Sequence, residues 1–237
     1  MAENNKWTMI VDLDKCTGCN ACVVACHAEN NVPIANEEEV IKGRGLHWIR
    51  IERYWEGEYP DIKARFLPVF CQQCGNAPCE PVCPTYASYH SDEEGLNGQI
   101  YARCVGTRYC GNNCPYKVRF FNWRAPEFDE PLNQQLNPDV PVRGAGVMEK
   151  CTFCIQRIQR VRQTPEGDYG PMTRDGDLQT ACTQACPSDA LIFGNLNDPE
   201  SRVSRMLPND RQARLLEHLG TEPAVYYLKG GTTNVGE

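Results

Sequence analysis

Arg103-Cys-Val-Gly-Thr-Arg-Tyr-Cys-Gly-Asn-Asn-Cys-Pro115 is the stretch around which the chain is organised. Its cysteines, Cys104, Cys110 and Cys114, take the first, third and fourth positions of the spacing C-x2-C-x2-C-x3-C-P. That spacing wraps an iron–sulfur cluster with its first three cysteines and passes the fourth to a second cluster. Thr107 stands where the second cysteine belongs. The stretch therefore predicts a cluster site that lacks one cysteine ligand.

Three further cysteine runs follow the same template. They are Cys16, Cys19, Cys22 and Cys26 with the full spacing, Cys71, Cys74, Cys79 and Cys83 with two added residues, and Cys151, Cys154, Cys182 and Cys186 split into two pairs. Cys-Pro-x-x-Ala occurs twice, at 83–87 and 186–190, and a basic residue precedes the first cysteine of three runs. We interpret the chain as four copies of one half-ferredoxin unit.

The cysteine content limits what the runs can bind. Fifteen cysteines in 237 residues is about 6%, in a chain too long for a small disulfide scaffold, and an odd number cannot pair completely. Thiolates suit zinc, copper(I) or iron–sulfur clusters. Zinc sites use two pairs of ligands, whereas a third cysteine three residues on lets one loop wrap a cubane. We predict iron–sulfur clusters, with a zinc-binding structural or nucleic-acid-binding protein as a remote alternative.

The number of cysteines predicts the kinds of cluster. Four [4Fe-4S] clusters require sixteen thiolates, and the chain has 15 cysteines. Three [4Fe-4S] clusters and one [3Fe-4S] cluster use every cysteine, with the vacant corner at Thr107. The alternative is that Thr107 or a solvent oxygen holds a fourth iron there.

The other residues show no motif for catalysis or for binding a nucleotide. The sequence has no dinucleotide-binding or phosphate-binding loop and no nucleophile–base pattern. The four histidines form no ligand pattern with the cysteines, and a net charge of -7 gives no indication of nucleic-acid binding. Five basic residues are expected on a solvated face, with steering of a partner or a place beside reduced clusters as the alternatives: Lys117, Arg119, Arg157, Arg160 and Arg162. We expect a non-catalytic electron-transfer protein.

Periodicity predicts an α+β protein with short hairpins, short helices and long loops. Strands are expected at 7–13, 48–54, 62–70 and 99–103, and helices at 21–28, 155–163 and 211–219. The polar stretch 37–45 is expected to be a surface loop, and 124–146 a long irregular loop.

The chain shows no membrane address of its own. Its first ten residues lack a basic region followed by an apolar one, and no run of 18 apolar residues occurs. We expect association with a membrane through partners, on the periplasmic face by co-export or on the cytoplasmic face.

The whole motif set resembles a known family. Four runs with the last one split, the segment Cys-Val-Gly-Thr-Arg-Tyr-Cys-Gly-Asn-Asn-Cys-Pro-Tyr-Lys-Val-Arg at 104–119 and the tail Leu-Gly-Thr-Glu-Pro-Ala-Val-Tyr-Tyr-Leu at 219–228 are similar to the iron–sulfur, or B-type, subunit of the DMSO reductase superfamily of molybdopterin oxidoreductases. The resemblance covers nearly the whole chain. The threonine in the third run looks most like alternative complex III and menaquinone reductase complexes.

The resemblance implies how the cysteines pair, where sequence alone also allows sequential pairing. The implied sets are Cys16, Cys19, Cys22 and Cys186 for cluster 1, Cys26, Cys151, Cys154 and Cys182 for cluster 2, Cys71, Cys74, Cys79 and Cys114 for cluster 3, and Cys83, Cys104 and Cys110 for the [3Fe-4S] cluster 4. One ferredoxin-like dicluster module, 50–125, is then nested in another, 1–49 plus 126–200, and 201–237 is a docking tail.

The resemblance also implies partners. In the family, the clusters connect a molybdopterin-type catalytic subunit to a membrane subunit that reacts with quinone, and the [3Fe-4S] cluster lies at the membrane end. A freestanding polyferredoxin is the alternative within the same class. The long tail and the Pro/Gly-rich loop disfavour it, because both are typical of segments that contact partners.

Overall fold

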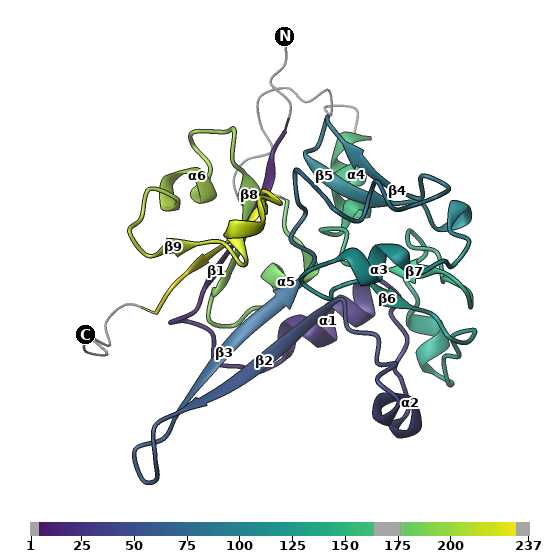
Figure 1. Ribbon diagram of the computed structural model, residues 1–237, viewed down its shortest axis with the longest axis horizontal. Helices are drawn as coiled ribbons and strands as arrows, with labels where there is room; N and C mark the ends of the chain where they lie inside the picture. Colours follow the sequence, from purple (N-terminus) through teal and green to yellow (C-terminus); the bar gives the residue numbers. More distant parts are fainter. Residues whose placement is uncertain (1–4, 164–175, 177, 231–237) are drawn as a thin grey trace.

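The computed structural model describes residues 5–163, 176 and 178–230. Short helices and strands alternate with long connections, so the expected α+β class is confirmed (Figure 1). The helices are α1 (Ala21–Glu29), α2 (Glu37–Ile41), α3 (Tyr109–Asn113), α4 (Ile155–Arg162), α5 (Ala181–Gln184) and α6 (Arg202–Met206), with 3-10 turns at Tyr101–Arg103, Leu132–Gln135 and Glu217–Leu219. The strands are β1 (Trp7–Asp12), β2 (Ile49–Glu56), β3 (Lys63–Phe70), β4 (Ser88–Ser91), β5 (Leu96–Gln99), β6 (Phe120–Phe121), β7 (Met148–Glu149), β8 (Leu191–Asn195), β9 (Gln212–Ala213) and β10 (Val225–Leu228).

A four-stranded sheet joins the two ends of the described chain. Its order is β8-β1-β10-β9, with β1 antiparallel to β8 and parallel to β10. Met9 lies opposite Phe193 on one side and Val225 on the other. All six residues of β1 and all four of β10 are buried. The sheet therefore brings the residues just before the first cysteine run next to those just after the fourth.

The tail differs from the prediction. Residues 211–219 were expected to be a helix, and this is wrong. They form strand β9, paired to β10, and a 3-10 turn at Glu217–Leu219. Leu216, at φ 50°, and Gly220, at φ 65°, flank that turn in the left-handed conformation, which an α-helix does not continue through. Pairing with the apolar strand β10 overrides the local helical preference.

The predicted hairpin is confirmed. β2 and β3 pair from Ile49 opposite Phe70 to Glu56 opposite Lys63 and project from the body as an arm (Figure 1). Only the inner end is buried, and beside it Trp48 lies in the core.

Two other expectations, the loop at 37–45 and the strand at 99–103, differ from the structure. The stretch 37–45 contains helix α2 because the Asn36 side chain accepts a hydrogen bond from the Glu39 N–H at 3.0 Å, and three glutamates in the first turn suit its positive end. The strand expected at 99–103 lies at Leu96–Gln99, where β5 pairs with β4 before a 3-10 turn.

The core contains thiols as well as apolar side chains. One cluster of buried residues packs Trp48, Phe70 and Phe153 with Cys22 and Cys26. A second contains five cysteines of runs two and three, namely Cys71, Cys74, Cys79, Cys110 and Cys114. In the described part of the chain, no helix has the length and hydropathy to cross a bilayer.

Leu228→Ala tests whether the tail is an integral strand. Leu228 is 1% exposed, so its truncation should lower the free energy of unfolding by about 2–5 kcal/mol. The matched control Leu219→Ala, at 48% exposure, should change it by less than about 0.5 kcal/mol. The measurement is urea unfolding followed by the protein's visible absorbance, and equal effects of the two substitutions would contradict the account.

Candidate iron-sulfur sites

The first group of thiols joins the two ends of the chain. Cys16, Cys19 and Cys22 line one cavity together with Cys186, and Ile51 and Pro68 of the hairpin close it. Burial, followed by the charges of the other three thiols, raises the pKa of Cys22 to about 12. The structure thus brings together the four residues that the resemblance assigns to cluster 1.

The second group shares a helix with the first. Cys22 and Cys26 are one turn apart on α1, so both face the interior and are buried. Burial, followed by the charges of Cys151, Cys154 and Cys182, raises the pKa of Cys26 well above its ordinary value. The four residues that the resemblance assigns to cluster 2 therefore interact with one another.

Asn30 holds two sulfurs of this second group. Its Nδ2 lies 3.5 Å from Cys26 Sγ and 3.8 Å from Cys154 Sγ. Because Asn30 is only 1% exposed, the amide can stabilise thiolates there without admitting solvent.

The third group lines a second cavity. Cys71, Cys74, Cys79 and Cys114 surround it, with Arg119 at its wall. Burial and then neighbouring thiols raise the pKa of Cys74 to about 12. Burial raises the pKa of Cys79 to about 11, although the charges of Arg119 and Lys150 oppose the increase.

Of the remaining cysteines, Cys83, Cys104 and Cys110, the structure brings only the last two together. Cys104 packs against the core cluster that contains buried Cys110, and its Sγ accepts the Met148 N–H at 3.4 Å. Thr107 is exposed on the loop between them. The described contacts of the Cys83 sulfur lie within its own turn, Thr85–Ser88.

The recurring Cys-Pro-x-x-Ala sequence has a structural role. The Ala87 N–H donates to Cys83 Sγ at 3.1 Å, and the Ala190 N–H donates to Cys186 Sγ at 3.3 Å. Burial alone raises the pKa of Cys83, but the N–H groups of this turn outweigh it and lower the pKa. The same balance lowers the pKa of Cys186. Each turn is therefore built to stabilise a thiolate.

The thiol groups suit iron–sulfur clusters. Thiols must lose their protons to bind a metal, and close, buried thiolates require positive charge between them. Among the described residues, no group of three His, Cys, Asp or Glu side chains is arranged to hold a single metal ion. Four thiols instead surround each of two cavities, as ligands of a multi-atom cluster must.

The basic residues that were expected on a solvated face divide into two sets. Arg160 is exposed and pairs with Asp139, and Arg157 pairs with Glu29. Arg119 is buried at 8% exposure, so the solvated interpretation is wrong for it. Its position in the apolar run 118–121 was the signal that could have identified it.

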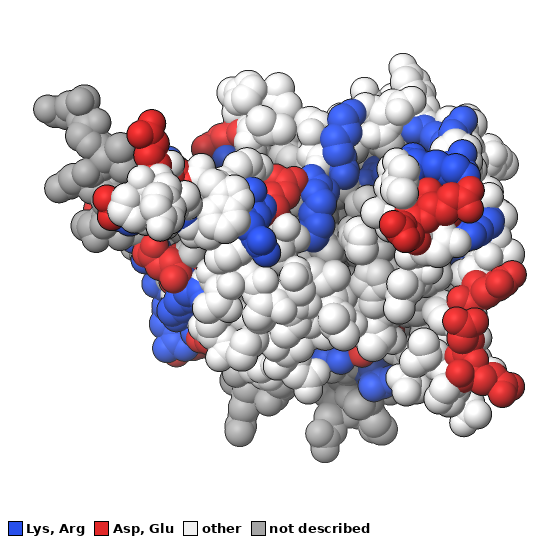
Figure 2. All heavy atoms as spheres, turned by 90° about the horizontal axis from the view of Figure 1, so that it is seen from below, with Lys and Arg blue, Asp and Glu red and all other residues white. Residues whose placement is uncertain are grey.

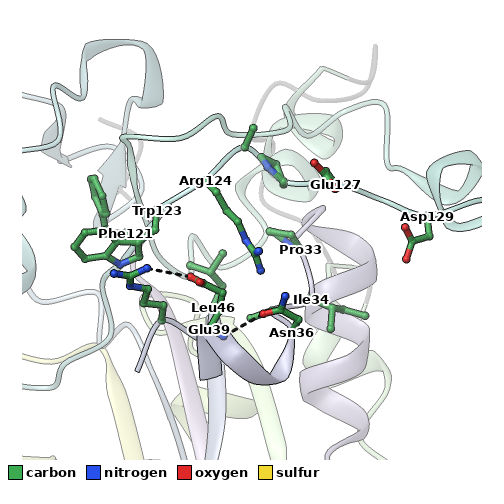
Figure 3. Close-up of a pocket in the computed structure, with 14 residues that line it drawn as sticks. Pro33, Ile34, Asn36, Glu39, Leu46, Phe121, Trp123, Arg124, Glu127 and Asp129 are labelled. Carbon is green, nitrogen blue, oxygen red and sulfur yellow. Dashed lines mark hydrogen bonds and ion pairs between the residues drawn. The ribbon is translucent and has the colours of Figure 1, made fainter. Parts of the chain in front are cut away.

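A surface hollow adjoins the third run. It has a volume of about 260 Å³ and lies between α2 and the segment 121–129 (Figure 3). Trp123 and Arg124 point toward it, and the Arg44 guanidinium lies 4.5 Å from the Trp123 ring. Arg108, next to Thr107, also lies over the Trp123 ring, at 4.7 Å from its centre, and over the Phe121 ring, at 5.1 Å.

Comparison with known proteins agrees with this chemistry. Two models of a 4Fe-4S dicluster domain match, one over residues 15–87 and one over residues 62–130. The iron–sulfur cluster-binding subunit of menaquinone reductase from Nitratidesulfovibrio vulgaris is 46% identical, over 94% of this chain and 88% of its own. An Hdr-like menaquinol oxidoreductase iron–sulfur subunit from Archaeoglobus fulgidus is 36% identical over 97% and 85%. The arsenate respiratory reductase iron–sulfur subunit of Shewanella sp. is 32% identical over 93% and 95%.

Gly18→Ala tests the loop that holds the first group. Gly18 has φ +70°, and an added Cβ would meet the Phe66 ring at 2.4 Å, so the substitution should displace the loop and reduce bound iron by about one cluster. Gly43 has the same φ of +70° but no atom within 4 Å. Iron analysis should show full loading in Gly43→Ala, and equal loading of both variants would refute this role of Gly18.

Proposed function

The chain belongs to the family of iron–sulfur subunits of molybdopterin oxidoreductases, and we propose that it carries electrons through four clusters between a molybdopterin-type catalytic subunit and a membrane subunit that reacts with quinone. It is an electron-transfer subunit, and catalysis belongs to a partner subunit. The observation that carries the proposal is a series of thiol groups, each of which adjoins the next.

The proposed ligand sets follow these neighbours. Cys16, Cys19, Cys22 and Cys186 hold cluster 1, Cys26, Cys151, Cys154 and Cys182 hold cluster 2, Cys71, Cys74, Cys79 and Cys114 hold cluster 3, and Cys83, Cys104 and Cys110 hold cluster 4. The two cavities lined by four thiols and the mutual charge effects in the second group support the first three sets. The shared core cluster of Cys104 and Cys110 supports the fourth.

Electrostatic interactions between neighbouring groups support an order for the clusters. Cys22 of the first group acts on the pKa of Cys182 in the second, and Cys71 of the third acts on that of Cys151 in the second. Arg119 interacts with Cys79 of the third group and with Cys110 of the fourth. These interactions support the order 1-2-3-4. Each bound cluster gives and accepts one electron, and the cysteines fix the clusters close enough for transfer.

Exposure of the thiols supports electron entry and exit at opposite ends. Cys19 of the first group is exposed, and Cys83 and Cys104 of the fourth are half-buried. All four thiols of the third group are buried, and in the second group Cys26 and Cys154 are buried while Cys151 and Cys182 are half-buried. A conductor between two partner proteins requires this arrangement, because its terminal clusters must approach the surface and its inner ones must be shielded.

Apolar surface at both ends supports two partners. At the fourth group, Val105, Tyr109 and Trp123 are exposed. At the first, Val24 of α1 is 68% exposed, and the face seen from below is largely free of charged residues across its centre (Figure 2). Exposed apolar areas of this kind mark protein interfaces. We assign the fourth group to the membrane subunit and the first to the catalytic subunit, so that the chain reaches the membrane through partners.

We further propose the nested organisation, with 50–125 inserted between 1–49 and 126–200. Its support is that β1 pairs with β8 and that the first run lies beside the fourth. In this organisation the tail, 201–237, docks on the outer module, where β10 lies beside β1.

The odd cysteine number supports a [3Fe-4S] cluster with Thr107 at its vacant corner. The oxidised protein should show the EPR signal of a three-iron cluster near the free-electron position. Thr107→Cys should supply the missing thiolate and remove that signal, whereas the control Thr107→Ser should retain it. Persistence of the signal in Thr107→Cys would show that Thr107 is not the vacant corner.

The partner assignment is tested by affinity purification of the tagged chain from its own detergent-solubilised membranes. A pterin-containing subunit and a membrane subunit should copurify. Substitution of Val105 by Asp should release the membrane subunit alone, because a buried charge opposes contact there. Recovery of the wild-type chain by itself would instead support a freestanding polyferredoxin.

A further inference from the structure

Arg119 is a buried cation that lies against a thiol. It immediately precedes β6, and its side chain lines the cavity of the third thiol group. Its Nη1 lies 3.1 Å from Cys79 Sγ and 3.3 Å from Asn97 Oδ1. An arginine at 8% exposure keeps its charge, because guanidinium does not deprotonate in proteins. A full positive charge is therefore fixed beside a proposed cluster ligand.

The partners of Arg119 leave that charge unneutralised. Its Nη2 donates to Ser88 Oγ and Gln99 Oε1, and both of these acceptors are neutral. Among the residues that the structure describes, no carboxylate forms an ion pair with it. By contrast, buried Arg143 pairs with Glu149 at 2.8 Å. Burial of an unpaired charge is strongly unfavourable, so the thiolates are the groups that balance Arg119.

Arg119 faces two thiol groups at once. Its guanidinium lies 3.1 Å from Cys79 Sγ of the third group. Arg119 also lies close to Gly111, which follows Cys110 of the fourth group, and the charges of Cys71 and Cys110 act on its guanidinium. The β4–β5 hairpin holds it there, because Ser88, Asn97 and Gln99 all come from these strands. One rigid cation is thus shared between the last two proposed clusters.

A shared cation has a defined effect on electron transfer. Adding an electron makes a cluster more negative, so a nearby fixed positive charge favours the reduced state, and it does so strongly where water is excluded. Since one charge serves both clusters, their potentials move in the same direction and the difference between them changes little. Both rise relative to the clusters of the other two groups.

We propose that Arg119 raises the reduction potentials of clusters 3 and 4 together and so favours the residence of electrons at that end of the chain. The inference rests on the proposed function, because it requires the four clusters assigned there. Arg119 acts through its fixed positive charge on the neighbouring clusters and carries no electron itself.

The decisive variant is Gln99→Glu. It keeps the length of the side chain and its hydrogen bond to Arg119, and it adds a carboxylate that neutralises the guanidinium. Arg119→Gln removes the charge directly, and Arg119→Lys retains it. The matched controls make the same changes at exposed positions of α4, as Gln159→Glu and Arg160→Gln, where solvent screens the charge.

The measurement is an EPR-monitored redox titration of the full chain, purified anaerobically with its clusters. Gln99→Glu and Arg119→Gln should lower the midpoint potentials of the three-iron cluster and of one four-iron cluster, and leave the other two unchanged. Arg119→Lys should recover most of the shift, and both controls should match wild type. A role of Arg119 in packing alone predicts equal shifts in Arg119→Lys and Arg119→Gln, because both variants alter the packing and only one removes the charge.

Unchanged potentials in Gln99→Glu with full iron content would overturn the inference, as would an equal shift of all four clusters. Gln99→Glu decides the question even where Arg119→Gln fails to assemble. Failure of the proposed function has a different signature, since the three-iron signal would then be missing from the wild-type protein before any variant is compared.

Discussion

Burial of closely spaced thiols is the constraint on which this structure depends. Burial and neighbouring thiols raise the pKa of Cys22, Cys74 and Cys182 each to about 12. At neutral pH such thiols give up their protons only to a centre that supplies positive charge. The surrounding protein has small sheets and short helices, and the thiols are part of its two main core clusters. Cluster binding is therefore coupled to folding, because the thiols that bind a cluster are also part of the core.

The four-stranded sheet makes the long-range pairing of thiols possible. Strand β1 delivers the first run, and β8 follows the fourth, so antiparallel pairing of these strands places Cys186 beside Cys16. Helix α1 then carries the chain from one thiol group to the next, because Cys22 and Cys26 are a single turn apart. The β4–β5 hairpin likewise positions Arg119, because residues of both strands accept hydrogen bonds from its guanidinium beside the third thiol group. Secondary structure here serves mainly to position sulfur and charge.

Much of this could be predicted from sequence, because ligand spacing is local. The runs, strand β1, helix α1 and the β2–β3 hairpin follow from short patterns that the structure confirms. Helix α2 was missed because its stability depends on the Asn36 cap and on glutamates that also suit a loop. The tail was read as a helix because its strand exists only through pairing with β10. The apolar run 118–121 indicates that Arg119 is buried, but a single charged residue does not reveal which thiols from distant runs lie beside it.

The central claim is that 15 cysteines hold three [4Fe-4S] clusters and one [3Fe-4S] cluster. Native mass spectrometry of the anaerobically purified chain tests it most directly, because it weighs the intact protein with everything bound to it. The account predicts the mass of the polypeptide plus three four-iron clusters and one three-iron cluster. A mass with four [4Fe-4S] clusters, or with zinc in place of iron and sulfide, would contradict it.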